Sequence, residues 1–354
     1  MLKNLQTLSL PQRRFVFFVI FGGVLLAFIG VTVLLINSAL NTGQRVQSIA
    51  LDPAVSIAQY VTLPDDNAYP PALAVLPDNT IITGSYSSGA VYAISPMGHV
   101  SELLNTRDQI GAFTGVALMP DGASVLVIDQ NDTDPRTAGG RLWRVPIFSS
   151  EITEFPTSID ATGWVSPNDL TFDALGRLYV TDSGRNEVWR FDADGSNGTI
   201  WFVPPPPAAD AVSQRRAVTG IAYDALTDSM LVTDPEQNII YRISVSDASS
   251  SIVYEHGARP NPPGFDGLTV APDGTIYVAA LGQNGIARVD EANNELVYIA
   301  GLFRGASDVE YVAPGLLYVT NFDQASIVLP FIAPQLPFAL DVIDLNTPSA
   351  TATP

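Results

Sequence analysis

Residues 267–280 read GLTVAPDGTIYVAA, a short apolar strand, a Pro-Asp-Gly turn and a second apolar strand. Five other places along the chain carry the same arrangement. The six copies start at Ala72, Gly115, Asp169, Gly220, Gly267 and Asp308. The spacings between these starts are 43, 54, 51, 47 and 41 residues. A repeat of this length that contains only strand patterns is typical of a β-propeller. The sequence therefore predicts an all-β fold with six four-stranded blades around one channel.

The six copies lie within residues 57–345, which are predicted to form one closed domain because the blades of a propeller pack against each other in a ring. A ring has no exposed sheet edge when the first and last strands share a blade. We therefore expect Ile57–Leu63 to pair with the strands that follow Leu316.

The composition excludes several classes of function. The net charge is −19, from 36 acidic and 17 basic residues, whereas a nucleic-acid-binding surface needs a basic stripe. The chain contains no cysteine, which excludes disulfide scaffolds, zinc–thiolate sites and thiol nucleophiles. Only two histidines are present, His99 and His256, so a histidine-rich metal cage is excluded as well. The acidic balance allows a cationic ligand or a metal ion, although a solvated acidic surface has the same composition.

The N-terminal region contains a predicted transmembrane helix. Residues 15–36 include no charge, and 22 helical residues span about 33 Å, enough for the apolar core of a bilayer. Lys3, Arg13 and Arg14 precede this segment. The positive-inside rule therefore places residues 1–14 in the cytoplasm and the propeller outside, in a single-pass protein of the cytoplasmic membrane.

The alternative for residues 15–36 is a cleaved secretion signal. The apolar region of such a signal is usually about 7–15 residues long, so we favour an uncleaved anchor in contact with the lipid bilayer. Residues 37–56 are interpreted as a polar tether. Residues 346–354 are interpreted as a disordered tail from their composition.

The longest connections are predicted to gather at one end of the propeller. With the strands of a blade named a to d from the centre outward, the a–b and c–d turns lie at one end because neighbouring strands are antiparallel. The b–c loops and the links to the next blade lie at the other end, which we call the long-loop face. It receives the long segments 129–141, 157–168, 204–218 and 256–266. Long loops on one face of a rigid scaffold usually form its binding surface.

Two of the repeats resemble a known superfamily. The third reads Ser166-Pro167-Asn168-Asp169 before its first strand, and the fifth reads Phe265-Asp266-Gly267-Leu268. These strings resemble the gluconolactonase and senescence-marker-protein (regucalcin) superfamily, which shades into strictosidine-synthase-like, paraoxonase-like and NHL-repeat propellers. The resemblance covers roughly residues 60–345. It implies a divalent cation, typically calcium, held by oxygen ligands at the starts of the inner strands, where it activates a lactone or ester.

The match to the ligand positions of the family is partial. The resemblance implies metal-binding and catalytic roles for Asn168 in the third blade and Asp266 in the fifth. Thr219 stands where the family has Asn in the fourth blade, and Pro71 stands where it has Glu in the first. The equivalent positions of the second and sixth blades hold Thr114 and Ser307.

Further candidates for the ligand face are acidic groups near the same ends of the strands. They are Asp169, Asp182, Asp234 and Asp308, which could supply more oxygen ligands. Asp182 ends a second strand and has an alternative role as a cap for the next loop. His256 lies on a long loop and could act as a general base, although a lone loop histidine is usually solvated.

Two functions stay open. The favoured one is a propeller that binds a small molecule, a glycan or a protein on its long-loop face and has a degenerate metal site. The alternative is a lactonase or esterase that depends on calcium or another divalent cation and uses Asp266 and Asn168.

Overall fold

A computed structural model describes residues 9–40, 45–103, 106–134, 137–149, 151–329 and 332–346. Residues 1–8 of the predicted cytoplasmic segment and residues 347–354 of the predicted tail lie outside this part of the chain. By their contacts, the residues up to 44 and residues 325–336 form one unit, and residues 45–324 with those from 337 onward form a second unit, the propeller.

The first unit contains the helix α1 (Leu10–Leu40), which is 31 residues long and extends beyond the predicted range of 15–36. Its segment Leu10–Leu34 has a mean hydropathy of 2.7. Among the described residues it is the one helix that is long and apolar enough to cross a bilayer. A helix of this kind occurs both in membrane anchors and in signal sequences.

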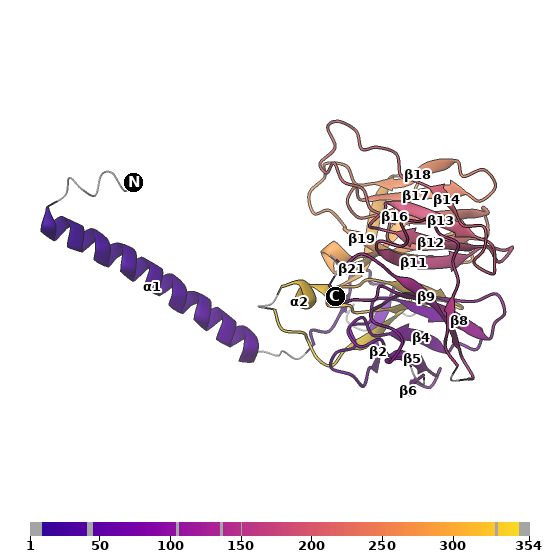
Figure 1. Cartoon of the computed structure of the whole chain (residues 1–354), viewed down its shortest axis with the longest axis horizontal. Helices are drawn as coiled ribbons and strands as arrows, with labels where there is room; N and C mark the ends of the chain where they lie inside the picture. The colour runs from indigo at the N-terminus through magenta and orange to yellow at the C-terminus, as the bar shows by residue number, and fades with distance from the viewer. Residues whose placement is uncertain are drawn as a thin grey trace. The chain divides into compact units, whose positions relative to one another are not determined.

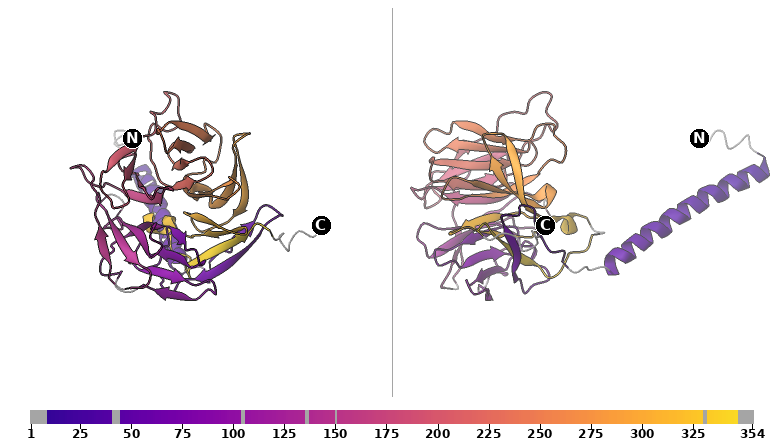
Figure 2. Two further views of the ribbon diagram at one scale, coloured as in Figure 1. Left: turned by 90° about the vertical axis from the view of Figure 1, so that its right-hand side faces the viewer. Right: turned by 180° about the vertical axis from the view of Figure 1, so that it is seen from behind.

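The propeller consists of six antiparallel sheets arranged in a ring (Figure 1; Figure 2, left). Each sheet is a blade. The first blade contains β3 (Leu73–Val75), β4 (Ile81–Gly84), β5 (Val91–Ile94) and β6 (Val100–Glu102), and the second contains β7 (Phe113–Leu118), β8 (Ser124–Asp129), β9 (Arg141–Pro146) and β10 (Thr153–Phe155). The third blade contains β11 (Pro167–Phe172), β12 (Leu178–Asp182), β13 (Glu187–Phe191) and β14 (Thr199–Phe202).

The fourth and fifth blades follow in chain order, with a 3-10 helix, η2 (Leu281–Gln283), between β20 and β21. Their strands are β15 (Ile221–Asp224), β16 (Ser229–Asp234), β17 (Ile239–Ser244), β18 (Ser250–Glu255); and β19 (Phe265–Val270), β20 (Ile276–Ala280), β21 (Gly285–Asp290), β22 (Glu295–Gly301). The sixth blade contains β23 (Val309–Val312), β24 (Leu316–Val319), β25 (Ala339–Asp344) and the N-terminal strand β2 (Ser56–Thr62).

The sixth blade closes the ring as predicted. Its outer strand β2 comes from the start of the propeller and pairs antiparallel with β25, with Ile57 opposite Ile343. The innermost strands β3, β7, β11, β15, β19 and β23 each contact the next one, and β23 contacts β3. The six-bladed fold and the shared blade are therefore confirmed.

The core lies between neighbouring blades. Every residue of the second strands β8, β12 and β16 is buried, because each of these strands has a partner on both sides and a blade against each face. Ile82 and Val91 of the first blade, for example, share an apolar cluster with Phe113 and Val127 of the second. Burial of one such aliphatic side chain stabilises the fold by about 1.5–3 kcal/mol.

Two features differ from the sequence prediction. The short strand β1 (Ile49–Ala50) pairs with β22, so the fifth blade has five strands and part of the predicted tether at 37–56 belongs to the propeller. Two residues are too few to give a detectable strand pattern. The second feature is the b–c connection of the sixth blade, residues 320–338, which contains the helix α2 (Gln324–Val328). This long connection has no clear signal in the sequence, because its apolar residues resemble those of strands.

Candidate functional site

The inner strands begin with irregular pairing at the long-loop face. In the third blade, Asn168 and Asp169 together lie opposite the single residue Thr181 of β12. In the fifth blade, Asp266 and Gly267 lie opposite Ala279. Such β-bulges turn side chains away from the regular pleat and are frequent next to functional sites. A third irregularity lies at Thr114 in the second blade, so the bulges include the two positions that match the superfamily, and all three lie at the same end of the ring of inner strands.

Asp266 and Asn168 are half-buried, and their side-chain polar atoms form no hydrogen bonds with the described residues. Burial raises the pKa of Asp266 well above its usual range, and the nearby charge of Asp169 raises it further. An acidic group with no donor to stabilise its ionised form is available to a ligand that supplies one.

The other positions of the predicted ring are used by the fold. The hydroxyl of Ser307 donates to Pro71 O at 2.7 Å, and the Thr114 hydroxyl donates to Pro167 O at 3.3 Å. The Thr219 hydroxyl lies 3.0 Å from the Thr233 hydroxyl. Pro71 has no side-chain donor or acceptor. Three of the six positions therefore use their hydroxyls within or between blades, and only Asn168 and Asp266 present free oxygen atoms.

Asp169 and Asp308 link neighbouring blades. Asp169 Oδ2 accepts the N–H of Ile221 in the fourth blade at 2.9 Å. Asp308 Oδ2 accepts the N–H of Leu73 in the first blade at 2.9 Å, an equivalent bond made three blades further round the ring. The next blade has a small residue at the point of approach, Gly220 or Ala72. These carboxylates capture backbone N–H groups of innermost strands, which have no further strand to pair with.

The inner strands carry a concentration of acidic groups. Burial raises the pKa of Asp169 and Asp308, and the negative charge of Asp169 acts on Asp308 in the same direction, although backbone N–H donors partly oppose the shift at both. Glu310 of β23 is also affected by the charge of Asp169, and its pKa is raised to about 7 by burial and by Asp169, against the lowering effect of Thr269. Glu310 was not among the predicted site residues, because it has the position of an ordinary strand residue. Its place two residues after Asp308, on the same face of the strand, was the available signal.

Asp182 and Asp234 are buried caps at the ends of second strands. Both carboxylate oxygens of Asp182 are used, since Oδ2 accepts Val165 N at 2.8 Å and Oδ1 accepts the N–H groups of Ser166, Gly184 and Arg185. Asp234 Oδ1 accepts three backbone N–H groups in the same way. Burial raises the pKa of Asp234 to about 6, despite these hydrogen bonds. In the structure these two groups hold the long connections in place.

His256 is buried rather than solvated, which corrects the sequence-based interpretation. Its side chain is 8% exposed. Nδ1 lies 2.9 Å from the Tyr254 hydroxyl, and Nε2 lies 3.1 Å from Arg259 O and 3.2 Å from Pro260 O. Both ring nitrogens are thus occupied by the loop, because the neighbouring Tyr254 and the chain reversal at Arg259 enclose the ring.

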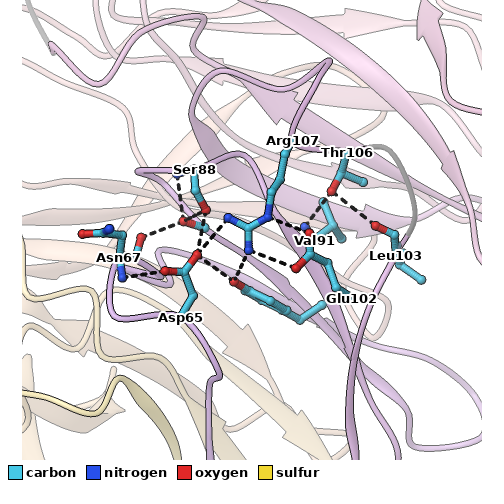
Figure 3. Close-up of polar contacts among 10 residues, drawn as sticks. Asp65, Asn67, Ser88, Val91, Glu102, Leu103, Thr106 and Arg107 are labelled. Atoms are coloured by element: carbon cyan, nitrogen blue, oxygen red, sulfur yellow. Dashed lines mark hydrogen bonds and ion pairs between the residues drawn. The ribbon is translucent and has the colours of Figure 1, made fainter.

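A second polar cluster lies in the first blade around Arg107 (Figure 3). The guanidinium donates to Glu102 Oε1 at 2.7 Å and to Asp65 Oδ2 at 2.9 Å. Asp65 also accepts Asn67 N at 2.8 Å and the Ser88 hydroxyl at 3.1 Å. Burial acts to raise the pKa of Asp65, but these donors outweigh it and the pKa is lowered. The polar groups of this cluster bond to one another and so hold the connections of the first blade together.

The site lacks a complete set of metal ligands among the described residues. Within the part of the chain that the structure describes, no three His, Cys, Asp or Glu side chains come together in a group that could hold a metal ion. Calcium usually takes six to eight oxygen ligands, whereas the mouth offers the free oxygens of Asn168 and Asp266. The residues present do not fit the metal constellation that the superfamily implies.

Comparisons with known proteins support the fold. Residues 136–302 match a family model described as the SMP-30/Gluconolactonase/LRE-like region. Solved structures with this fold include a gluconolactonase from Xanthomonas campestris, with a TM-score of 0.60, 13% identity and coverage of 85% of this chain and 98% of that one. They also include a putative gluconolactonase, with a TM-score of 0.59, 17% identity and coverage of 84% and 97%.

A third related structure is a catalytically inactive virginiamycin B lyase from Staphylococcus aureus with quinupristin, with a TM-score of 0.54, 17% identity and coverage of 80% and 82%. No curated protein matches the sequence. At these identities the likeness to solved structures shows the fold alone.

Proposed function

We propose that this six-bladed β-propeller, of which residues 136–302 match the SMP-30/Gluconolactonase/LRE-like family model, is a membrane-anchored, extracytoplasmic binding protein. Its ligand, a small molecule, a glycan or a group on a protein, binds at the channel mouth on the long-loop face. The observation that carries the proposal is the Asp266 carboxylate, which has no hydrogen-bond partner among the described residues and a raised pKa.

The surroundings of Asp266 favour a ligand with a positively charged group. The charges that shift the pKa values of Asp266, Asp308 and Glu310 are those of other carboxylates. A cationic group at the mouth would stabilise the ionised forms of these residues, and binding would release protons. The acidic balance of the whole chain, with a net charge of −19, attracts such ligands at longer range.

The anchor is the second part of the proposal. The apolar segment 15–36 within α1 is 22 residues long, longer than the apolar region of about 7–15 residues in a cleaved signal. The basic residues before it support a cytoplasmic N-terminus and an extracytoplasmic propeller.

Ligand-dependent thermal unfolding tests the binding function against the hydrolase. The probes are Ca²⁺, a small diamine such as putrescine, and simple lactones and aryl esters as substrates. We expect the diamine to raise the Tm and Asp266→Asn to abolish the shift. Asp273→Asn, in an exposed turn at the opposite end of the fifth blade, is the matched control and should retain it.

Calcium separates the two functions. A site with a Kd near ~10⁻⁴ M would add about 1.4 kcal/mol at millimolar Ca²⁺, and we expect no such effect because the ligand set is incomplete. A clear Ca²⁺ shift lost in Asp266→Asn, together with turnover of a lactone or ester, would establish the hydrolase and overturn the proposal. A diamine shift unchanged in Asp266→Asn would place the ligand elsewhere.

A further inference from the structure

The apolar segment in the b–c connection of the sixth blade has no role in the site described above. From Gln324 to Phe338 it contains no charged residue. Val328 is 58% exposed and Leu329 is 37% exposed. Residues 325–336 do not belong to the compact unit that contains the strands of the propeller. Exposed apolar side chains within an uncharged segment, on an otherwise acidic protein, mark a surface that meets a partner or a membrane.

Both ends of this segment meet at Asp341. Asn321, just before the segment, donates from Nδ2 to Ala339 O and to Asp341 Oδ2, each at 3.2 Å. On the same side, Asp323 pairs with Arg304 at 2.6 Å. The segment is therefore closed at its base by hydrogen bonds and ion pairs and projects from a fixed place on the propeller.

The chain that leaves α1 is attached at the same place. Arg45 forms a buried ion pair with Asp341, and the Ser48 hydroxyl donates to Asp341 Oδ2 at 2.9 Å. Only five residue steps separate Leu40, the end of α1, from Arg45. Fully extended, these steps span about 18 Å. The linker therefore allows at most about this distance between the end of α1 and the base of the apolar segment.

The long-loop face is the side on which this attachment lies. The segment is a b–c connection, which by the strand order leaves from that face. The strand β1 runs antiparallel to β22, which ends there, so the residues before Ile49 lie toward the same face.

We propose that residues 324–329 and 332–337 are a second membrane-contact segment, which inserts its exposed apolar side chains among the lipids beside the anchor. The proposal rests on the anchoring role of α1 proposed above. An uncharged segment that is held at the membrane surface gains free energy from burial of its apolar area at the headgroup boundary. Proline at 334 and 337 suits a non-helical interfacial loop.

The absence of native cysteine allows a direct test on the full chain in phospholipid vesicles. An environment-sensitive fluorophore is attached to one introduced cysteine at a time. Leu329→Cys tests the segment, and Leu26→Cys in α1 reports the anchor. Leu226→Cys is the matched control, an exposed leucine (64%) in an a–b turn at the opposite end of the propeller.

We expect blue-shifted emission, and loss of most of the fluorescence with spin-labelled phospholipid, at positions 26 and 329 but not at 226. Quenching at 26 without quenching at 329 would overturn the second contact and leave the anchor intact. A blue shift at 329 without lipid quenching would show that protein, such as a second copy, covers the segment, and would also overturn the proposal. No quenching at 26 would overturn the anchor and the inference together.

Discussion

Replacement of Glu310 by glutamine should make the propeller more stable at alkaline pH. Glu310 lies in the innermost strand of the sixth blade, and its pKa is raised from 4.5 to about 7 by burial and by Asp169, against the lowering effect of Thr269. The folded protein therefore binds more protons than the unfolded chain between about pH 4.5 and 7. Across this window the free energy of unfolding falls as the pH rises, because the ionised carboxylate is less well accommodated in the folded state.

The size of the effect follows from the shift. The difference between the two pKa values is about 2.5 units, and each unit corresponds to 1.36 kcal/mol, so full ionisation costs about 3 kcal/mol of stability. For a domain of this length, that is about 5 °C in Tm. Glu310→Gln retains the shape and a carbonyl acceptor for Thr269 but cannot ionise. We expect the variant to match the native protein near pH 4.5 and to exceed its stability by up to this amount at pH 8.

Thermal unfolding from pH 4.5 to 8.5, followed by circular dichroism, measures the difference. The control is Glu154→Gln, an exposed residue on the outer strand β10, where a surface substitution should change stability by less than about 0.5 kcal/mol at any pH. Parallel pH profiles for the native protein and Glu310→Gln would refute the argument, since they would mean that the carboxylate ionises as easily in the folded as in the unfolded chain.

Three further predictions concern topology and structural carboxylates. Protease added to spheroplasts should degrade the propeller, and full protection there would show that the orientation is wrong. Asp182→Ala removes the acceptor of four backbone N–H groups and should lower the unfolding free energy in urea by about 3 kcal/mol, whereas the exposed control Asp66→Ala should change it little. Arg45→Met leaves the buried Asp341 carboxylate without its counter-ion and should cost about 3–5 kcal/mol. Addition of Asp341→Asn should recover part of that loss, and no recovery would argue against the ion pair as the cause.

The fold could be predicted from the sequence because each copy of the repeat corresponds to one blade. The copies that start at Gly115 and Gly267 show where the inner strands begin, and the same register led to Asn168 and Asp266. It also led to the correct pairing of the N-terminal strand with the last blade. Local strand patterns and turn residues agree with the closed ring, which makes such patterns informative.

The remaining features depend on contacts between distant residues. An Asp that follows Thr at the end of a second strand is compatible both with a ligand at the channel mouth and with a cap for the next loop. The four N–H donors around Asp182 come from two separate loops. The burial of His256 depends on the Tyr254 hydroxyl and on the path of the following loop. The pKa of Glu310 in the sixth blade is raised in part by Asp169, which lies in the third blade. None of these relations has a fixed spacing that a sequence pattern could show.

The attachment of the tether at Asp341 determines from where the channel mouth can be reached. Arg45 joins the propeller close to the long-loop face, so if α1 anchors the chain as proposed, the short tether limits how far this face can lie from the membrane. A ligand of the mouth would then be drawn from a thin layer next to the membrane. Molecules that already travel in the plane of the membrane, including amine-bearing headgroups, would find Asp266 by a search in two dimensions instead of three, and would have an advantage over ligands that arrive from bulk solution.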